Sequence, residues 1–302
     1  MVFVTGGTGF VGRSLVRRLL SRGERVRLLC RSERRRFTPD EPDEPDKKEG
    51  KIEWIPGEIG LRESLLRGME GADAVIHLVG ILVEPGGQTF EKLHVEGTQN
   101  VVEAMRPSGV RRLLHMSALG SRPNAASRYH QTKWRAEELV RASGLDATIF
   151  RPSLIFGRED RSMNLLAKIA AYSPVVPVVG PGKNRLQPVW VEDVSESFVQ
   201  ALRNPLAVGK SYSLCGPRPY TFNELIDLIL RIQGLSRAKV HLPVWALKGP
   251  AALAERLLPR PPLTRDQLTM LQEDNLCVEN EAAKELGLSF KGPEEILPTY
   301  LK

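Results

Sequence analysis

The sequence predicts an α/β fold, with a doubly wound parallel sheet followed by a smaller, helix-rich C-terminal lobe. Three observations support this class. Short apolar runs alternate with longer helical patterns through residues 2–152, a glycine-rich turn follows the first run, and the alternation weakens after Pro152. Strands that alternate with helices form parallel sheets with right-handed crossovers.

We interpret six short apolar runs as strands, at residues 2–6, 25–30, 51–56, 72–80, 111–117 and 147–152. Helical patterns lie between them at 12–23, 90–105 and 127–143. In the first helix, Leu15, Leu19 and Leu20 share one face and Gly23 ends the pattern. The run at 72–80 is of the kind found in strands buried on both faces of a sheet.

The C-terminal part of the chain contains more helix and more turns. A short helix is expected at 166–172, and residues 187–205 return to a strand followed by a helix. The helices expected at 221–234 and 264–274 each open with a threonine that is followed three residues later by Glu or Gln. That pattern is a capping box, which satisfies free amides at a helix start.

Two further segments differ from this pattern. Residues 33–51 are rich in Pro, Asp and Glu, which predicts a mobile, solvated loop. Residues 244–258 are apolar enough to lie on a membrane or on a partner protein. We favour a buried core helix for this segment, interrupted at Gly249 and Pro250.

The net charge of +7 is concentrated in local clusters, notably Arg31 and Arg34 to Arg36. Basic clusters with stacking aromatic residues are typical of nucleic-acid binding, but aromatic residues make up only 6% of this chain. We therefore expect a phosphate-bearing small molecule as the ligand and no nucleic acid.

The three cysteines, Cys30, Cys215 and Cys277, lie far apart, and no Cys/His spacing typical of a metal site occurs. A sparse, odd number of cysteines indicates a reducing compartment with three inert thiols. No apolar run approaches the roughly 20 residues that span a bilayer. We therefore expect a cytoplasmic protein without a bound metal.

The stretch "TGGTGFVG" places Gly6, Gly9 and Gly12 between the first strand and the first helix. A tight turn favours a residue that tolerates positive φ, and close approach of a diphosphate requires a missing Cβ. The start of the helix offers unpaired amides and the positive end of its dipole to an anion. This motif predicts a Rossmann-type site for a pyridine dinucleotide.

The end of the second strand decides which nucleotide is expected. NAD-binding units usually place a carboxylate there to accept from the ribose hydroxyl. Here the sequence reads Cys30-Arg31-Ser32, and an arginine can bind a 2′-phosphate through two hydrogen bonds. We predict that Arg31 and Ser32 favour NADP(H) over NAD(H). The alternative is that Arg31 is a solvated loop charge close to Glu33.

Tyr129 and Lys133 lie four residues apart on one face of a predicted helix, just after the fifth strand. Ligands of open parallel sheets bind at the carboxyl ends of the strands. A nearby ammonium and a positively charged nicotinamide both favour the phenolate form of tyrosine. We predict that Tyr129 transfers a proton and that Lys133 supports it and holds the cofactor ribose.

These motifs resemble the extended and atypical branches of the short-chain dehydrogenase/reductase superfamily. The matching stretches are "TGGTGFVG", "GADAVIHLVG", "VEGTQNVVEA", "YHQTK", "RPSLIFG", "LQPVWVEDV" and "GPRPYTFNEL". The combination is most similar to bacterial relatives of the NADPH-binding accessory subunit of respiratory complex I, which are often called sugar-nucleotide epimerase-like.

The resemblance implies a set of cofactor contacts. The diphosphate is expected against Gly6, Thr8, Gly9, Phe10 and Val11, with Gly12 closing the loop. The adenine is expected near Glu58 and Ile59, and the adenosine ribose and diphosphate above Leu78, Val79 and Gly80. The nicotinamide is expected against Pro152.

One departure bears on catalysis. Active members of the superfamily usually end the fifth strand with two small hydroxyl residues, the second of which orients the substrate oxygen. Here the pair is Ser117-Ala118. Neighbouring strand residues point to opposite faces, so Ser117, a candidate catalytic residue, cannot simply replace that hydroxyl. Loss of one such hydrogen bond costs ~10²-fold in rate.

Three functions stay open. The first is an NADPH-dependent oxidoreductase acting on a carbonyl or quinone-like substrate. The second is a non-catalytic NADPH-binding or assembly protein, and the third is a nucleotide-sugar epimerase or dehydratase. Peripheral association with the inner face of a membrane or with a respiratory complex is compatible with them. The substrate and the oligomeric state are not indicated by the sequence.

The expected domains follow the change in pattern. Residues 1–157 are expected to form the NAD(P)-binding domain, to which 187–204 return. Residues 158–186 and 205–302 are expected to form the smaller lobe, which binds substrate or a partner.

Overall fold

The computed structural model describes residues 1–32, 52–259 and 261–301. The loop expected at 33–51 therefore lies outside the described residues. Seven strands form one parallel sheet in the order β11-β6-β5-β4-β1-β2-β3, which confirms the predicted fold class. The strands are β1 (Val2–Thr5), β2 (Val26–Cys30), β3 (Ile52–Pro56), β4 (Ala74–His77), β5 (Arg112–Met116), β6 (Asp146–Pro152) and β11 (Ser211–Leu214).

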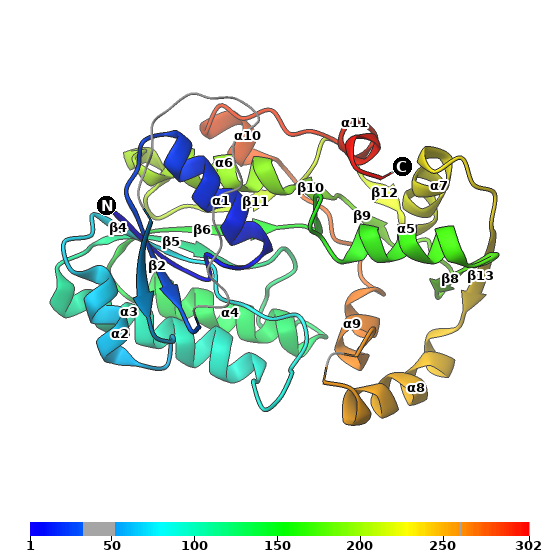
Figure 1. The fold of residues 1–302 in the computed structure, drawn as a ribbon, viewed down its shortest axis with the longest axis horizontal. Helices are drawn as coiled ribbons and strands as arrows, with labels where there is room; N and C mark the ends of the chain where they lie inside the picture. Colours follow the sequence, from blue (N-terminus) through cyan, green and yellow to red (C-terminus); the bar gives the residue numbers. More distant parts are fainter. Residues whose placement is uncertain (33–51, 260, 302) are drawn as a thin grey trace.

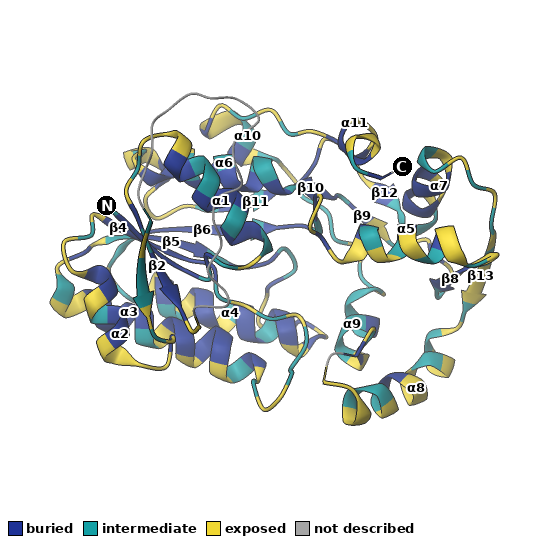
Figure 2. Cartoon of the chain, viewed as in Figure 1, coloured by how far each residue is buried: buried dark blue, intermediate teal, exposed yellow. Residues whose placement is uncertain are grey.

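Helices cover both faces of this sheet (Figure 1). One face carries α1 (Phe10–Ser21), α6 (Val191–Leu202) and α10 (Glu281–Glu285). The other carries α2 (Arg62–Met69), α3 (Gly97–Ser108), α4 (Arg128–Arg141) and a π-helical turn, η2 (Glu91–Glu96). The strands are buried between the two layers (Figure 2). Because side chains alternate along a strand, Val4 packs towards α1 while Phe3 packs towards α2 and α3.

The last strand of the sheet comes from a part of the chain that the sequence analysis assigned to the smaller lobe. β11 pairs in parallel with β6, and Tyr212 and Leu214 are fully buried. The Tyr212 hydroxyl donates to Glu285 of α10 at 2.7 Å, which attaches α10 to the same edge. The assignment of 205–302 wholly to the smaller lobe was therefore wrong, because a strand of four residues gives too short a pattern to be recognised.

The smaller lobe contains short strands and five helices of the described chain. The strands are β7 (Ile155–Phe156), β8 (Val175–Val179), β9 (Arg185–Leu186), β10 (Val189–Trp190), β12 (Tyr220–Thr221) and β13 (Ala238–Leu242). The helices are α5 (Ser162–Tyr172), α7 (Phe222–Ile232), α8 (Val244–Leu257), α9 (Arg265–Met270) and α11 (Pro293–Ile296). Both capping boxes are confirmed, at Thr221 with Glu224 and at Thr264 with Gln267. Single 3₁₀ turns lie at Pro205–Ala207 (η3) and Leu297–Thr299 (η4).

The apolar segment 244–258 does not form a core helix. α8 continues through Gly249 and Pro250, and Ala251 is its one buried residue. In Figure 2 this helix lies at the lower right and is mostly exposed. No helix of the described residues is long and apolar enough to cross a membrane.

The expectation of three free thiols was also wrong. Cys215, just after β11, forms a disulfide with Cys277, with their Cα atoms 6.1 Å apart. Cys30 is free and buried. The two bonded cysteines are 62 positions apart, and only the docking of the C-terminal segment on the sheet edge brings them together.

Candidate functional site

The glycine loop between β1 and α1 leaves no room for side chains. Gly6 has a φ of +79°, and a Cβ there would lie 2.9 Å from the backbone carbon of Leu78. A Cβ at Gly12 would lie 2.4 Å from the carbonyl oxygen of Gly6. The amide of Gly9 donates to that same oxygen at 3.0 Å and closes the turn. The loop is therefore tightly folded at the start of α1, as a diphosphate site requires.

The other expected cofactor positions follow the carboxyl ends of neighbouring strands. β4 is followed by the buried Leu78, the half-buried Val79 and the exposed Gly80. Pro152 ends β6, and its carbonyl accepts from the amide of Leu119 at 2.9 Å. Together with the glycine loop, these segments form one continuous edge on both sides of the point where the strand order reverses.

The positions expected to select the nucleotide lie at the far end of this edge. Arg31 and Ser32 follow β2 and are exposed. Glu58, after the adjacent β3, is exposed as well, whereas Ile59 is buried against Gly97 of α3. A guanidinium is thus available at the end of β2, where the ribose hydroxyl ligand of NAD-binding units usually lies.

Tyr129 lies in the first turn of α4 and is buried by aromatic and apolar neighbours. Its ring packs edge-on against Phe90 and His94, and it shares a small apolar cluster with Ala118. Its hydroxyl has no hydrogen-bond partner within the part of the chain that the structure describes. Burial raises the pKa of Tyr129 above its ordinary value.

Lys133 lies one turn further along α4 and is buried. Its Nζ donates to the carbonyl oxygen of Met116 at 3.0 Å, and Gly80 leaves it space, since a Cβ there would lie 3.0 Å from Nζ. Burial lowers the pKa of Lys133 to about 8, and the nearby Glu137 carboxylate opposes that shift. The predicted lowering of the Tyr129 pKa by this ammonium is therefore not found here, because the desolvation of the phenol dominates.

Ser117 and Ala118 occupy the positions expected from the sequence. The Ser117 hydroxyl donates to Ser121 at 3.2 Å, whereas Ala118 packs against Tyr129. The methyl group, and not a hydroxyl, therefore faces the phenol.

A chain of buried hydrogen bonds positions α4, and the sequence analysis missed it. The amide of Ile81 donates to Nε2 of His94 at 3.1 Å, so this nitrogen is unprotonated. The opposite nitrogen, Nδ1, then donates to Thr132 at 2.9 Å, and Thr132 donates to the carbonyl of Tyr129. The loop after β4 is thus connected to the backbone of Tyr129 through neutral His94.

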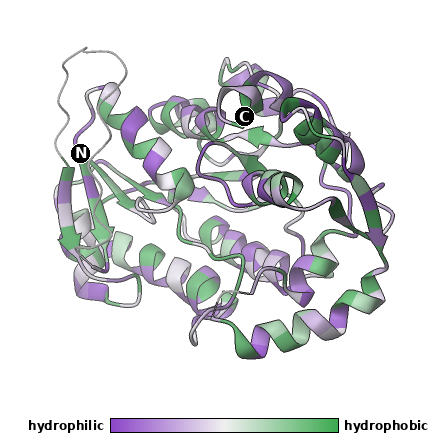
Figure 3. Ribbon diagram, turned by 45° about the vertical axis from the view of Figure 1, so that its right-hand side comes forward, coloured by the Kyte–Doolittle hydropathy of each residue, from purple (hydrophilic) through white to green (hydrophobic). Residues whose placement is uncertain are grey.

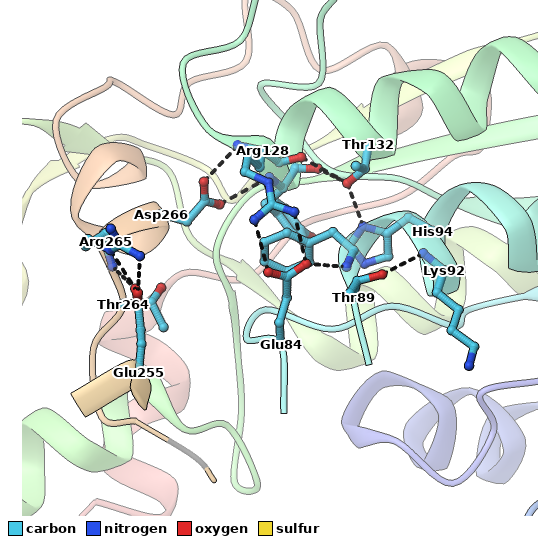
Figure 4. Close-up of polar contacts among 12 residues, drawn as sticks. Glu84, Thr89, Lys92, His94, Arg128, Thr132, Glu255, Thr264, Arg265 and Asp266 are labelled. Carbon is cyan, nitrogen blue, oxygen red and sulfur yellow. Dashed lines mark hydrogen bonds and ion pairs between the residues drawn. The ribbon is translucent and has the colours of Figure 1, made fainter. Parts of the chain in front are cut away.

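The C-terminal part of the chain also contacts this helix. The Asp266 carboxylate of α9 accepts from the amides of Arg128 and Tyr129 at 2.7 and 3.1 Å (Figure 4). Asn275 donates to the carbonyl of Leu119 and accepts from the Ser153 hydroxyl, so it joins the segments that follow β5 and β6. Both partners lie more than 100 residues from the residues they contact, and no local pattern predicts them.

A pocket of about 450 Å³ opens between the sheet domain and the smaller lobe, lined by Phe90, whose other contacts include the Tyr129 ring. Phe90 and the ion pair of Arg128 with Glu84, at 3.1 Å, form one wall. Glu255 of α8 and Arg265 of α9 form the other and are paired at 2.8 Å (Figure 4). The pocket therefore has an apolar floor at Phe90 and charged rims. No group of three or more His, Cys, Asp or Glu suited to a metal ion occurs among the described residues.

Comparison with known families decides the classification. The family described as the NAD dependent epimerase/dehydratase family matches residues 2–215, more than half of the chain. The chain belongs to this family. The resemblance to extended short-chain dehydrogenases/reductases is confirmed.

Relatives of this epimerase/dehydratase-type chain have diverse descriptions. The "NADH-ubiquinone oxidoreductase 40 kDa subunit, mitochondrial" of Neurospora crassa is 29% identical over 94% of this chain and 74% of that protein. The "Ceramide reductase" of Caulobacter vibrioides is 31% identical over 84% of this chain and 77% of that protein. A solved structure, MoeE5 in complex with UDP-glucuronic acid and NAD, has the same fold, with a TM-score of 0.77 at 21% identity over 99% and 97% of the two chains.

A third relative is described as a ketoreductase. The "4-hydroxy-2-methyl-3-oxo-4-farnesyl-3,4-dihydroquinoline-1-oxide ketoreductase" of Stigmatella aurantiaca is 28% identical over 94% of this chain and 90% of that protein. The relatives thus include reductases and subunits of a respiratory complex, within one NAD(P)-binding family.

Four of the five histidines are buried, and three of them, His77, His94 and His115, are almost completely so. His77 has two threonine partners, as a satisfied core histidine should, whereas both ring nitrogens of His115 lack a partner in the described structure. Burial lowers the pKa of His77 to about 3 and that of His94 to about 2, and it lowers the pKa of His115 well below the ordinary value.

We expect His115→Leu to raise the free energy of unfolding by about 1–2 kcal/mol at pH 7, because a buried polar group without partners is costly. Below a pH of about 6.5, the unfolded chain binds protons that the folded chain excludes, so stability falls as the pH falls towards the folded-state values. The variant removes one such site and reduces the loss between pH 7 and 5 by roughly 2 kcal/mol. Urea unfolding at both pH values measures these changes.

His241→Leu, at an exposed histidine, is the matched control for loss of an imidazole. Equal acid sensitivity of the His115 variant and the unmodified protein would contradict the assignment of His115 as an unprotonated core residue.

Proposed function

We propose that the protein is an NADPH-dependent oxidoreductase that reduces a carbonyl or quinone-like group. The observation that carries this proposal is the Tyr129 hydroxyl, which has no partner among the described residues and belongs to α4, the helix that also carries Lys133. Phe90 packs against the Tyr129 ring and lines the pocket. The residues fit a pyridine dinucleotide, since Gly6 and Gly12 leave no space for a Cβ and Gly80 makes room for Lys133. When bound, the nucleotide supplies a hydride.

The chain's own residues supply the proton and the orientation. Because burial raises its pKa, Tyr129 keeps its proton at neutral pH and is suited to donate it to a carbonyl oxygen. Lys133 lies next to Gly80 on the cofactor side of α4 and is placed to hold ribose hydroxyls. Phe90 and Ala118 pack against the Tyr129 side chain and shield it on that side.

We propose NADP(H) as the preferred nucleotide, with Arg31 binding its 2′-phosphate. Arg31→Ala is expected to weaken NADPH binding by about 10–100-fold, since hydrogen bonds between charged groups contribute about 1.5–3 kcal/mol. NADH binding is expected to change little. Calorimetric titration of both nucleotides measures this.

Arg25→Ala is the matched control, because Arg25 is also exposed but directly precedes β2, at the opposite end of that strand from Arg31. Equal weakening of NADH and NADPH by Arg31→Ala, or tighter binding of NADH to the unmodified protein, would contradict this preference.

We propose that the substrate is an amphiphilic carbonyl compound. The names of two relatives refer to a ceramide and to a farnesyl-bearing ring compound. The pocket likewise combines an apolar floor with charged rims. The test is NADPH oxidation with long-chain ketones, isoprenoid quinones and small water-soluble carbonyls, with mass spectrometry of molecules released from the purified protein. If none of these compound classes led to oxidation of NADPH, the proposal would be contradicted.

A second function is favoured by one observation. Ala118 removes the hydroxyl that normally faces the tyrosine, which suits a protein that holds NADPH without turnover and assembles with a respiratory complex. Such a protein is expected to release NADPH on denaturation and to reduce none of the carbonyls. Isomerisation of a UDP-sugar without net oxidation would instead support the epimerase alternative. For the first two functions we propose peripheral association with a membrane. The Cys215–Cys277 disulfide removes the support that three free thiols gave to a reducing cytoplasm.

A further inference from the structure

We propose that α8 docks the protein on a membrane surface that contains anionic phospholipids and that this contact places the pocket at the lipid headgroups. The docking rests on the exposed residues of α8 alone. Its use for substrate entry rests on the proposed function.

The solvent-facing side of α8 is apolar. Trp245, Leu253 and Leu257 are 77%, 58% and 70% exposed, although they belong to the residue types that are usually buried. With Gly249, they recur at intervals of four residues, so they form one stripe along the helix. Figure 3 shows α8 along the lower edge of the molecule, with hydrophobic turns separated by a few hydrophilic residues.

Two basic residues lie on α8 itself, and others lie on the segments that precede it in the smaller lobe. Residues 162–183 and 235–258, which include α5, β8, β13 and α8, carry six basic residues and one acidic residue. The basic residues are Lys168, Lys183, Arg237, Lys239, Lys248 and Arg256. Glu255, the one acidic residue, is neutralised by Arg265, and of the basic residues Lys239 is paired with Asp227 of α7. Lys248 and Arg256 are both exposed on α8, so the charge beside the stripe is complementary to an anionic surface.

This composition is that of a helix lying in the plane of a membrane interface. Such helices combine tryptophan and leucine with lysine and arginine and insert about 5–10 Å into the boundary of headgroups and acyl chains. A helix of 14 residues is about 21 Å long and does not span the hydrocarbon core. A tryptophan at such a boundary buries its ring and keeps its N–H hydrated.

The opposite side of α8 leads to the candidate site. Ala251 is buried towards the protein, and Glu255 lines the pocket together with Phe90 and Arg128. The neighbouring α9 binds the first turn of α4 through Asp266. A bilayer held against α8 therefore lies one helix diameter from the pocket, and a membrane-resident amphiphile can enter without crossing bulk water.

The test is binding of the full-length protein to phosphatidylcholine vesicles with and without phosphatidylglycerol, measured by co-sedimentation. We expect at least tenfold tighter binding to the anionic vesicles, weakened by salt. The double variant L253E/L257E is expected to lose at least tenfold in binding, and K248E/R256E to lose the preference for phosphatidylglycerol. Leu206→Glu, at an equally exposed leucine of the sheet domain, should bind as the unmodified protein does. Thermal unfolding and NADPH binding check that each variant is folded.

Failure of the unmodified protein to bind anionic vesicles at low salt would overturn the proposal. Full binding by L253E/L257E would overturn it as well. So would a change from dimer to monomer in that variant without any vesicle binding, since α8 would then be an interface between copies. These readouts need no turnover, so they are independent of the proposed reaction. Reduction of a water-soluble carbonyl by L253E/L257E at the unmodified rate separates docking from catalysis.

Discussion

Replacement of Tyr129 by phenylalanine is expected to lower kcat by about 10²–10⁴-fold, the range for loss of a general acid. The phenyl ring keeps the contacts with Phe90 and Ala118, and the lost hydroxyl has no partner in the described structure whose loss would be destabilising. The dissociation constant of NADPH should therefore stay within about twofold. Steady-state kinetics with the substrate from the carbonyl panel and a cofactor titration measure both quantities.

Tyr172→Phe serves as the matched control because Tyr172 is 84% exposed at the end of α5. An unchanged kcat in Tyr129→Phe would remove the phenol from the proposed chemistry. Loss of cofactor binding in that variant would instead mean that Tyr129 serves the nucleotide alone.

Replacement of Ala118 by serine is expected to raise kcat by up to about 10²-fold, because it restores a hydroxyl beside the phenol. Ala118 shares one cluster with Phe90 and Tyr129, so an added hydroxyl is positioned next to a carbonyl oxygen bound at Tyr129. The effect should appear in kcat rather than in the affinity for NADPH, since Ala118 is not among the positions expected to contact the cofactor.

Ala125→Ser is the control, because it adds a hydroxyl to the same loop between β5 and α4. Ala125 is also buried but does not belong to the cluster that contains Tyr129. Activity in Ala118→Ser where the unmodified protein has none would support the assembly role for the natural chain. A fall in kcat in Ala118→Ser would mean that the methyl group shapes the pocket for the substrate.

The sheet and the glycine loop are predictable because their signals are local. A strand-turn-helix unit at the start of the chain fixes Gly6 and Gly12 in a single short stretch, and the spacing of Tyr129 and Lys133 is read within one helix turn. What each residue contacts is less predictable. The Lys133 ammonium was expected to favour the phenolate form of Tyr129. Instead, the ammonium donates to the carbonyl of Met116, and burial raises the pKa of the tyrosine.

The contacts that complete the site come from distant parts of the chain. Asp266 and His94 both hold the backbone of α4, yet neither lies in a motif that indicates such a role. β11 is too short for its pattern to be recognised in the sequence. Cys215 and Cys277 come within bonding distance of each other only when the C-terminal segment docks on the sheet edge. α8 was expected to be buried because its composition is apolar, but composition alone does not say which surface covers a helix.

The position of Asn275 has a consequence for biosynthesis. Its side chain joins the segments after β5 and β6, and Cys277, two residues later, is bonded to the end of β11. A ribosome-bound chain that lacks these residues can form the glycine loop and the tyrosine helix, but the connections around them stay open. The connections around the candidate site are therefore completed only once Asn275 and Cys277 have been synthesised, well after the nucleotide-binding half has emerged.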